Sequence, residues 1–257
     1  MSTPTGVFTP KPGAAPLHRQ VLAQAAMESK LMLRNGEQLL LAVVIPVIVL
    51  IGGVEGAQHL DLSFSRRPVD VFAPGVLALA VMSTAFTSLA IATGFERRYG
   101  VIKRLGSSPL PRSGLLLGKV GAVLLVEVLQ ILVLSLVAVA LGWEPHTSVL
   151  AAGLTIVLGT AAFAALGLFV AGVLRAEATL AAANLVYLLL MAGGAVVLPS
   201  SAYGDFGGVA RLLPSGALGD ALREAFWSGG FQWGSLLVLA VWAGIGAVLT
   251  ARTFKWE

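Results

Sequence analysis

The sequence predicts an all-α integral membrane protein that crosses the bilayer six times. Apolar residues make up 57% of the chain and charged residues only 12%, whereas a soluble domain has about 25% charged residues. The mean hydropathy of +0.88 points the same way. Since a membrane-spanning helix needs about 20 residues, the 257 residues of the chain fit six such helices and their loops in one domain.

Two segments precede the first apolar stretch. Residues 1–16 hold four prolines and lack the hydrophobic core of a signal peptide, so we expect a disordered cytoplasmic tail that is not cleaved. From 17 to 35 apolar residues recur with a helical period, and basic residues gather opposite them: Arg19, Lys30 and Arg34. Such a helix is typical of the membrane interface. The alternative is that it forms only the polar first turns of the first span.

Six apolar stretches follow, each long enough or nearly so to cross about 30 Å of hydrocarbon as a helix. They cover residues 37–54, 71–94, 114–142, 148–174, 178–198 and 233–251. We therefore expect residues 17–257 to form a single transmembrane domain.

The distribution of Lys and Arg predicts the orientation of these spans. Of the 17 such residues, 13 fall in the N-terminal segment, in 95–119, in 175–177 and at the C-terminus, and four fall in the alternate loops. Cytoplasmic loops carry the excess of Lys and Arg. Both termini are therefore expected in the cytoplasm of a protein of the plasma membrane, and the basic residues are expected to contact the lipid bilayer and not nucleic acid.

Residues 95–106 predict a short amphipathic helix between the second and third spans. Its apolar residues share one arc of the helical wheel: Phe95, Tyr99, Ile102 and Leu105. Most of its charged residues lie opposite: Glu96, Arg97, Lys103 and Arg104. The prolines at 109 and 111 then stop it, because proline lacks the N–H that a continuing helix needs. Such a helix suits lipid headgroups or a cytoplasmic partner; the alternative is a segment that only sets topology.

Two further motifs accompany this helix. The second span begins with Asp70, three residues, Pro74 and Gly75, and the third begins with FERRYGVIKRLGSSPLPRSGLLLGK. Together with the interfacial helix before the first span, this order resembles the membrane subunit of ABC-2 type transporters. The resemblance covers nearly the whole chain and is most specific over 70–119. It departs from the family pattern at Tyr99, where the family commonly has a second acidic residue.

The resemblance implies a permease subunit that works with a separate ABC ATPase. In that family the segment between the second and third spans is a coupling helix that fits a cleft on the ATPase, and the N-terminal helix also touches it. The implied ATPase contacts are Glu96, Arg97, Arg98, Tyr99, Gly100, Ile102, Lys103 and Arg104. ATP and Mg²⁺ would be held by the partner, and a second permease, either the same chain or a homologous one, would complete the transporter.

The residues themselves predict no catalytic, cofactor or metal site on this chain. GLLLGKV at 114–120 has three residues between its glycines where a phosphate loop needs four, and Val120 stands where Ser or Thr must reach magnesium. The three histidines lie apart, and neither H-E-x-x-H nor G-x-S-x-G is present, which disfavours an intramembrane enzyme. The chain is therefore expected not to be an enzyme by itself.

The longest outer loop, residues 199–232, contains the amphipathic stretch LPSGALGDALREAFW, with Ser215 as an expected N-cap. Its charged residues, Asp220, Arg223 and Glu224, lie opposite its apolar ones. In the ABC-2 family this region forms short helices that dip into the outer leaflet. A surface helix on the headgroups is the alternative.

Few polar residues within the spans need explaining. Glu127 is the main one, because an intramembrane carboxylate usually faces a bundle interior, a partner or a water-filled cavity. The other pathway or gating candidates are Gln130, Thr84, Ser88, Asn184 and Tyr187. Helix packing is the alternative use for all of them.

These features predict an exporter subunit that moves an amphipathic substrate, such as a drug, an antibiotic or a lipid, outward. The pathway candidates are apolar or hydroxyl-bearing, and aromatic residues, which stack on sugar rings, are only 7% of the chain. Export of a polysaccharide or glycolipid is one alternative. A secondary transporter is another, and it would be expected to show charged pairs or broken helices at mid-membrane.

Overall fold

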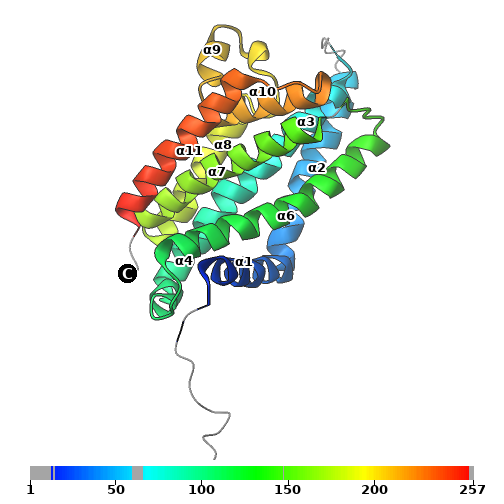
Figure 1. Cartoon of the computed structure of the whole chain (residues 1–257). Helices are drawn as coiled ribbons and strands as arrows, with labels where there is room; N and C mark the ends of the chain where they lie inside the picture. The colour runs from blue at the N-terminus through cyan, green and yellow to red at the C-terminus, as the bar shows by residue number, and fades with distance from the viewer. Residues whose placement is uncertain (1–12, 14, 60–65, 147, 255–257) are drawn as a thin grey trace, which may run out of the picture.

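The computed structural model describes residues 13, 15–59, 66–146 and 148–254 (Figure 1). All secondary structure in this part of the chain is helical, which confirms the predicted fold class. Six helices in it are long and apolar enough to cross a membrane: Ala42–His59, Pro68–Arg98, Arg112–Ala140, Val149–Val173, Ala176–Gly193 and Trp233–Thr253. The predicted tail, 1–16, lies largely outside the described residues.

The spans form one bundle with the N-terminal helix laid across one end (Figure 1). They are α2 (Gly36–His59), the continuous α3, η1 and α4 (Pro68–Met82, Ser83–Ser88 and Leu89–Arg98), α6 (Arg112–Ala140), α7 (Val149–Val173), α8 (Ala176–Gly193) and α11 (Trp233–Thr253). The second span lies at the centre, and α3 is buried almost along its whole length. Its middle section, η1, is a π-helix, a distortion that recurs at functional sites.

Glycines allow the central helices to approach closely. A Cβ on Gly167 of α7 would lie 2.8 Å from the carbonyl oxygen of Phe86, and one on Gly246 of α11 would lie 2.8 Å from the side chain of Ala165. Since small residues at helix contacts are the usual means of tight packing in membranes, these two glycines fix α7 between η1 and α11.

Helix α1 (Leu17–Arg34) confirms the predicted helix over 17–35 and packs along α6. Its buried face is narrow and consists of Gln24, Ala25 and Ser29. A Cβ on Gly118 of α6 would lie 2.6 Å from the side chain of Gln24, so the glycine is needed for this contact. The basic residues predicted for the outer face are all exposed: Arg19, Lys30 and Arg34. The position of α1 in the membrane interface stays a prediction.

The helix predicted over 95–106 is wrong in its extent, because the chain forms two helices there. Helix α4 continues the second span to Arg98, and α5 (Val101–Leu105) follows after a break. Gly100 makes the break with φ of +70°, a backbone conformation that glycine adopts without steric cost.

The fifth span was predicted to reach residue 198, but α8 ends at Gly193. Ala195 has φ of +54°, which takes the chain out of the helix. The carbonyl oxygens released there are bonded by other elements, since Gly194 accepts from the hydroxyl of Ser215 at 2.7 Å and Val196 accepts from Arg223 at 2.8 Å. A contact with a distant segment therefore ends this helix.

The loop between the last two spans folds into η2 (Ser200–Phe206), α9 (Gly207–Ala210) and α10 (Pro214–Trp227). Helix α10 is mostly buried against α3, α7 and α11, so the alternative of a surface helix is wrong. The predicted cap is also wrong, because Leu213 is the N-cap and the Ser215 hydroxyl bonds to Gly194 instead. The helices α9 and α10 lie at the opposite end of the bundle from α1 (Figure 1).

Candidate functional site

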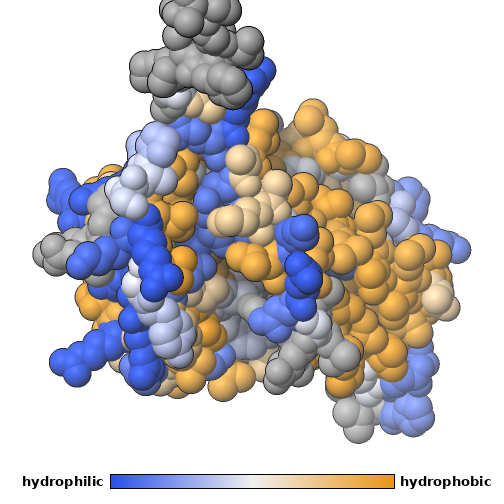
Figure 2. Space-filling view, turned by 90° about the horizontal axis from the view of Figure 1, so that it is seen from below, coloured by the Kyte–Doolittle hydropathy of each residue, from blue (hydrophilic) through white to orange (hydrophobic). Residues whose placement is uncertain are grey.

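The loop between the second and third spans forms an exposed surface at the α1 end of the bundle. Hydrophilic side chains gather over part of this end, beside a broad hydrophobic area (Figure 2). Tyr99 is 66% exposed, and Lys103 and Arg104 are exposed as well. Ile102 differs, because its side chain is fully buried in a small apolar cluster with Leu110, Leu115 and Phe254. Ile102 thus fastens α5 to the bundle and does not lie on the surface that the sequence predicted for a partner.

The three charged residues that end α4 turn sideways or inward. Arg97 donates to the carbonyl oxygen of Ala171 near the end of α7. Arg98 forms an ion pair with Glu177 at the start of α8. Glu96 points to α6. The exposed polar surface of the loop therefore includes Tyr99, Lys103 and Arg104, while Glu96, Arg97 and Arg98 join α4 to its neighbours.

A cluster of three charges joins α1, α4 and α6, and we call it the charge triad. The Lys119 ammonium lies 2.8 Å from a carboxylate oxygen of Glu28 and 2.5 Å from one of Glu96. The lysine side chain is 1% exposed, and the two glutamates are 12% and 23% exposed. Gln24 adds a hydrogen bond of 2.8 Å to Glu28. The triad fixes the base of the loop to the N-terminal helix and to the third span.

Glu127, Gln130 and Thr84 lie in contacts between helices. The Thr160 hydroxyl of α7 donates to Glu127 at 2.6 Å. Gln130 accepts from the Thr84 hydroxyl at 2.8 Å and donates to the carbonyl oxygen of Ala42 at 2.9 Å. All three side chains are buried. They join α6 to α7, to η1 and to α2, which favours the packing interpretation.

The other three candidates, Ser88, Asn184 and Tyr187, come together in one groove between α2, the second span and α8. This groove, which we call the π-helix groove, has a volume of about 510 Å³. Its polar walls come from Asn35, Ser83, Thr87, Ser88, Asn184 and Tyr187, and none of the described residues that line it is charged. The Thr87 hydroxyl is buried and has no hydrogen-bond partner among the described residues. A buried hydroxyl of this kind is suited to accept or donate a bond to a ligand.

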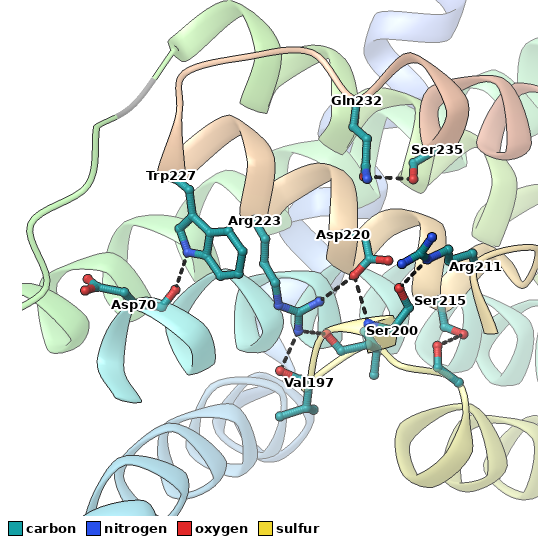
Figure 3. A network of polar contacts seen from close by, with 12 residues as sticks. Asp70, Val197, Ser200, Arg211, Ser215, Asp220, Arg223, Trp227, Gln232 and Ser235 are labelled. Atoms are coloured by element: carbon teal, nitrogen blue, oxygen red, sulfur yellow. Dashed lines mark hydrogen bonds and ion pairs between the residues drawn. The ribbon is translucent and has the colours of Figure 1, made fainter. Parts of the chain in front are cut away.

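A polar network closes the opposite end of the bundle (Figure 3). The buried Arg223 of α10 donates to the carbonyl oxygens of Val196 and Val197 at 2.8 and 2.5 Å and pairs with Asp220 at 3.3 Å. Burial lowers the pKa of Arg223 to about 10, and Asp220 opposes that shift, so the guanidinium stays charged at neutral pH. Trp227 donates to the carbonyl oxygen of Asp70 at 2.7 Å, which fastens α10 to the start of the second span.

Sequence reasoning missed Glu28, Lys119 and Arg223 as members of these sites. The sequence did mark Lys119 as unusual. A lone lysine two turns inside an apolar run costs free energy in the membrane unless its charge is paired. Its partner Glu28 lies 91 residues away, and no local pattern joins the two. Ser83 and Thr87 belong to the small polar stretch of the second span, whose groove depends on helices distant in the sequence.

The geometry agrees with a comparison against known families. A family model described as an ABC-2 family transporter protein matches residues 63–252, which is most of the chain. Curated proteins gave no match to the chain. The match includes the start of the second span, the loop with its α5 helix, and the helices η2, α9 and α10. The chain therefore belongs to the ABC-2 transporter family, whose members are membrane-embedded transport subunits and not the ATPase itself.

Proposed function

We propose that this chain is the permease subunit of an ABC exporter that moves an amphipathic substrate outward, driven by a separate ATPase subunit. The observation that carries the proposal is the exposed loop surface (Tyr99, Lys103 and Arg104) standing on the buried charge triad. A partner that pushes on this surface acts on α4, which the triad joins to α1 and α6. A loop that couples an ATPase to the spans needs such a connection between its exposed surface and the helices of the bundle.

Orientation follows from the distribution of charge. The loop surface, α1 and the end of α11 lie at one end of the bundle (Figure 1), and most Lys and Arg residues belong to these segments. By the positive-inside rule this end is cytoplasmic, with both termini in the cytoplasm of the plasma membrane. An ABC ATPase that holds ATP and Mg²⁺ would contact it there.

The π-helix groove is the proposed substrate pathway. Its walls combine apolar side chains with hydroxyl, amide and phenol groups and, among the described residues, no charge, which suits a molecule with an apolar body and uncharged hydrogen-bonding groups. Ile45 and Leu180 are 44% and 41% exposed, so the groove opens on the outside of the bundle. A second permease, the same chain or a homologous one, would cover that side.

The proposal is tested by purifying the tagged chain from its native membranes and measuring vanadate-sensitive ATP hydrolysis in the eluate. We expect an ABC ATPase to copurify. Reversing two charges on the loop surface, Lys103→Glu with Arg104→Glu, should remove it, because each contributes an ion pair to the contact. The control, Arg66→Glu with Arg211→Glu, makes the same charge change at the opposite end and should retain it. Retention of the ATPase by both double variants would refute the assignment of the loop.

A further inference from the structure

A second groove lies beside α4 and the turn between α7 and α8, and the proposed function does not use it. We call it the arginine groove. It has a volume of about 380 Å³, and its charged walls are Arg97, Arg98, Arg175 and Glu177. Three arginines against one glutamate leave the groove with a surplus of positive charge, which suits an anionic ligand.

We propose that the arginine groove binds the phosphate group of an anionic membrane phospholipid. Three membrane-spanning elements end at this groove, since α4 ends at Arg98, α7 ends at Val173 and α8 begins at Ala176. Spanning helices end where the hydrocarbon gives way to the headgroups. The groove is therefore at the level of lipid phosphates, and it lies at the same end of the bundle as the loop surface.

The arginines are arranged for such a group. Arg97 is held at the wall by its bond to the Ala171 carbonyl oxygen. Arg98 pairs with Glu177, but these side chains are 50% and 64% exposed, and an exposed ion pair is weak enough for Arg98 to turn to a phosphate. Arg175 is exposed and forms no ion pair within the described ranges of the chain. Guanidinium groups bind phosphate through parallel N–H bonds, which makes arginine the suitable cation.

Apolar surface directly beside the groove favours a lipid over a soluble phosphate. Val173, which lines the groove, is 54% exposed, and Leu185, farther along α8, is 58% exposed. An acyl chain can lie along α8 while its headgroup occupies the groove. The site therefore offers a basic surface to the headgroup of a phospholipid and an apolar surface to its acyl chain.

The test measures the dissociation constant of the first phosphatidylglycerol bound to the full chain in detergent, by native mass spectrometry. Arg175→Gln should weaken binding about five-fold, the effect of one basic residue at an anionic headgroup. Glu177→Gln should strengthen binding by up to about five-fold, because it removes the carboxylate that competes for Arg98. Arg252→Gln is the matched control, since Arg252 is an exposed arginine in the last turn of α11 that does not line the groove, and it should change binding less than about two-fold.

Opposite effects of Arg175→Gln and Glu177→Gln, with the control near wild type, would support the site. An equal loss in Arg175→Gln and Arg252→Gln would overturn it, because general charge attraction would then account for binding. Weaker binding in Glu177→Gln would overturn it as well. Competition by inorganic phosphate at the lipid's own concentration would assign the groove to a soluble phosphate and overturn the lipid assignment. The experiment contains no ATPase and no transported substrate, so its outcome is independent of the proposed function.

Discussion

The replacement of Lys119 by methionine tests the charge triad directly. Methionine matches the unbranched apolar stem of lysine and lacks the ammonium, so Glu28 and Glu96 face each other in a site where neither is more than 23% exposed. Breaking a buried ion pair from one side costs about 3–5 kcal/mol, because a charge is left without compensation. The partial exposure of both glutamates places the expected loss near the lower limit, at about 3 kcal/mol.

The free energy of unfolding can be measured by titration with sodium dodecyl sulfate in mixed micelles, followed by circular dichroism. Lys119→Met should lower it by about 3 kcal/mol. Adding Glu28→Gln and Glu96→Gln should recover most of that loss. Replacing a whole buried ion cluster by uncharged residues often changes the free energy of unfolding little. The control Lys30→Met changes an exposed lysine on α1 and should stay within about 0.5 kcal/mol of wild type.

A free energy of unfolding for Lys119→Met within about 1 kcal/mol of wild type would refute a stabilising role of the triad. A triple variant no more stable than Lys119→Met alone would refute it as well. In either case the three charges would not neutralise one another in the folded protein. The triad would then be too weak to connect the loop to α1, and the proposed coupling would need another path.

Three further sets of variants test the topology, the packing and the groove. In this cysteine-free chain, a cysteine placed at Ser107 should be protected from an impermeant thiol reagent in intact cells, whereas one placed at Ser201 should be labelled. The reverse result would invert the orientation. Gly75→Ala should destabilise the fold by more than about 2 kcal/mol because its Cβ would lie 2.2 Å from the carbonyl oxygen of Val197, whereas Gly244→Ala, with nothing within 4 Å, should be neutral in the same detergent titration. Thr87→Val keeps the shape of the side chain and should lower substrate-stimulated ATP hydrolysis several-fold without loss of stability, since its hydroxyl has no partner among the described residues; unchanged stimulation would remove Thr87 from the pathway.

The spans were predictable because their signal is local. An apolar run of about 20 residues must satisfy its backbone hydrogen bonds internally in lipid, and only a helix does so within one segment. The ends were less predictable, since they depend on contacts. The end of α8 at Gly193 needs Ser215 and Arg223 to bond the carbonyl oxygens that the chain exposes after it, and both come from a different helix.

The sites were predictable as residue types but not as groups. A lone acid such as Glu127 signals a polar contact inside the membrane, yet only the fold shows that Thr160 of α7 supplies it. Ser88 on the second span and the pair Asn184 and Tyr187 on the fifth were recognised separately, and packing of α8 beside η1 brings them into one groove. The amphipathic pattern of residues 95–106 indicated a helix and a polar face, but Gly100 divides the helix.

The second span connects the features on which transport would depend. Its start is bonded to α10 through Asp70 and Trp227, its π-helix lines the groove, and its end carries Glu96 in the charge triad. A displacement of α5 therefore reaches the groove through α4 and η1, which are parts of one helix. Since a π-helix is the least regular part of such a helix, a change in its hydrogen bonding would move Ser83 and Thr87 before it moved the end of the span that is bonded to Trp227. A variant that weakens the triad should for this reason reduce substrate stimulation of the ATPase even when the ATPase remains bound.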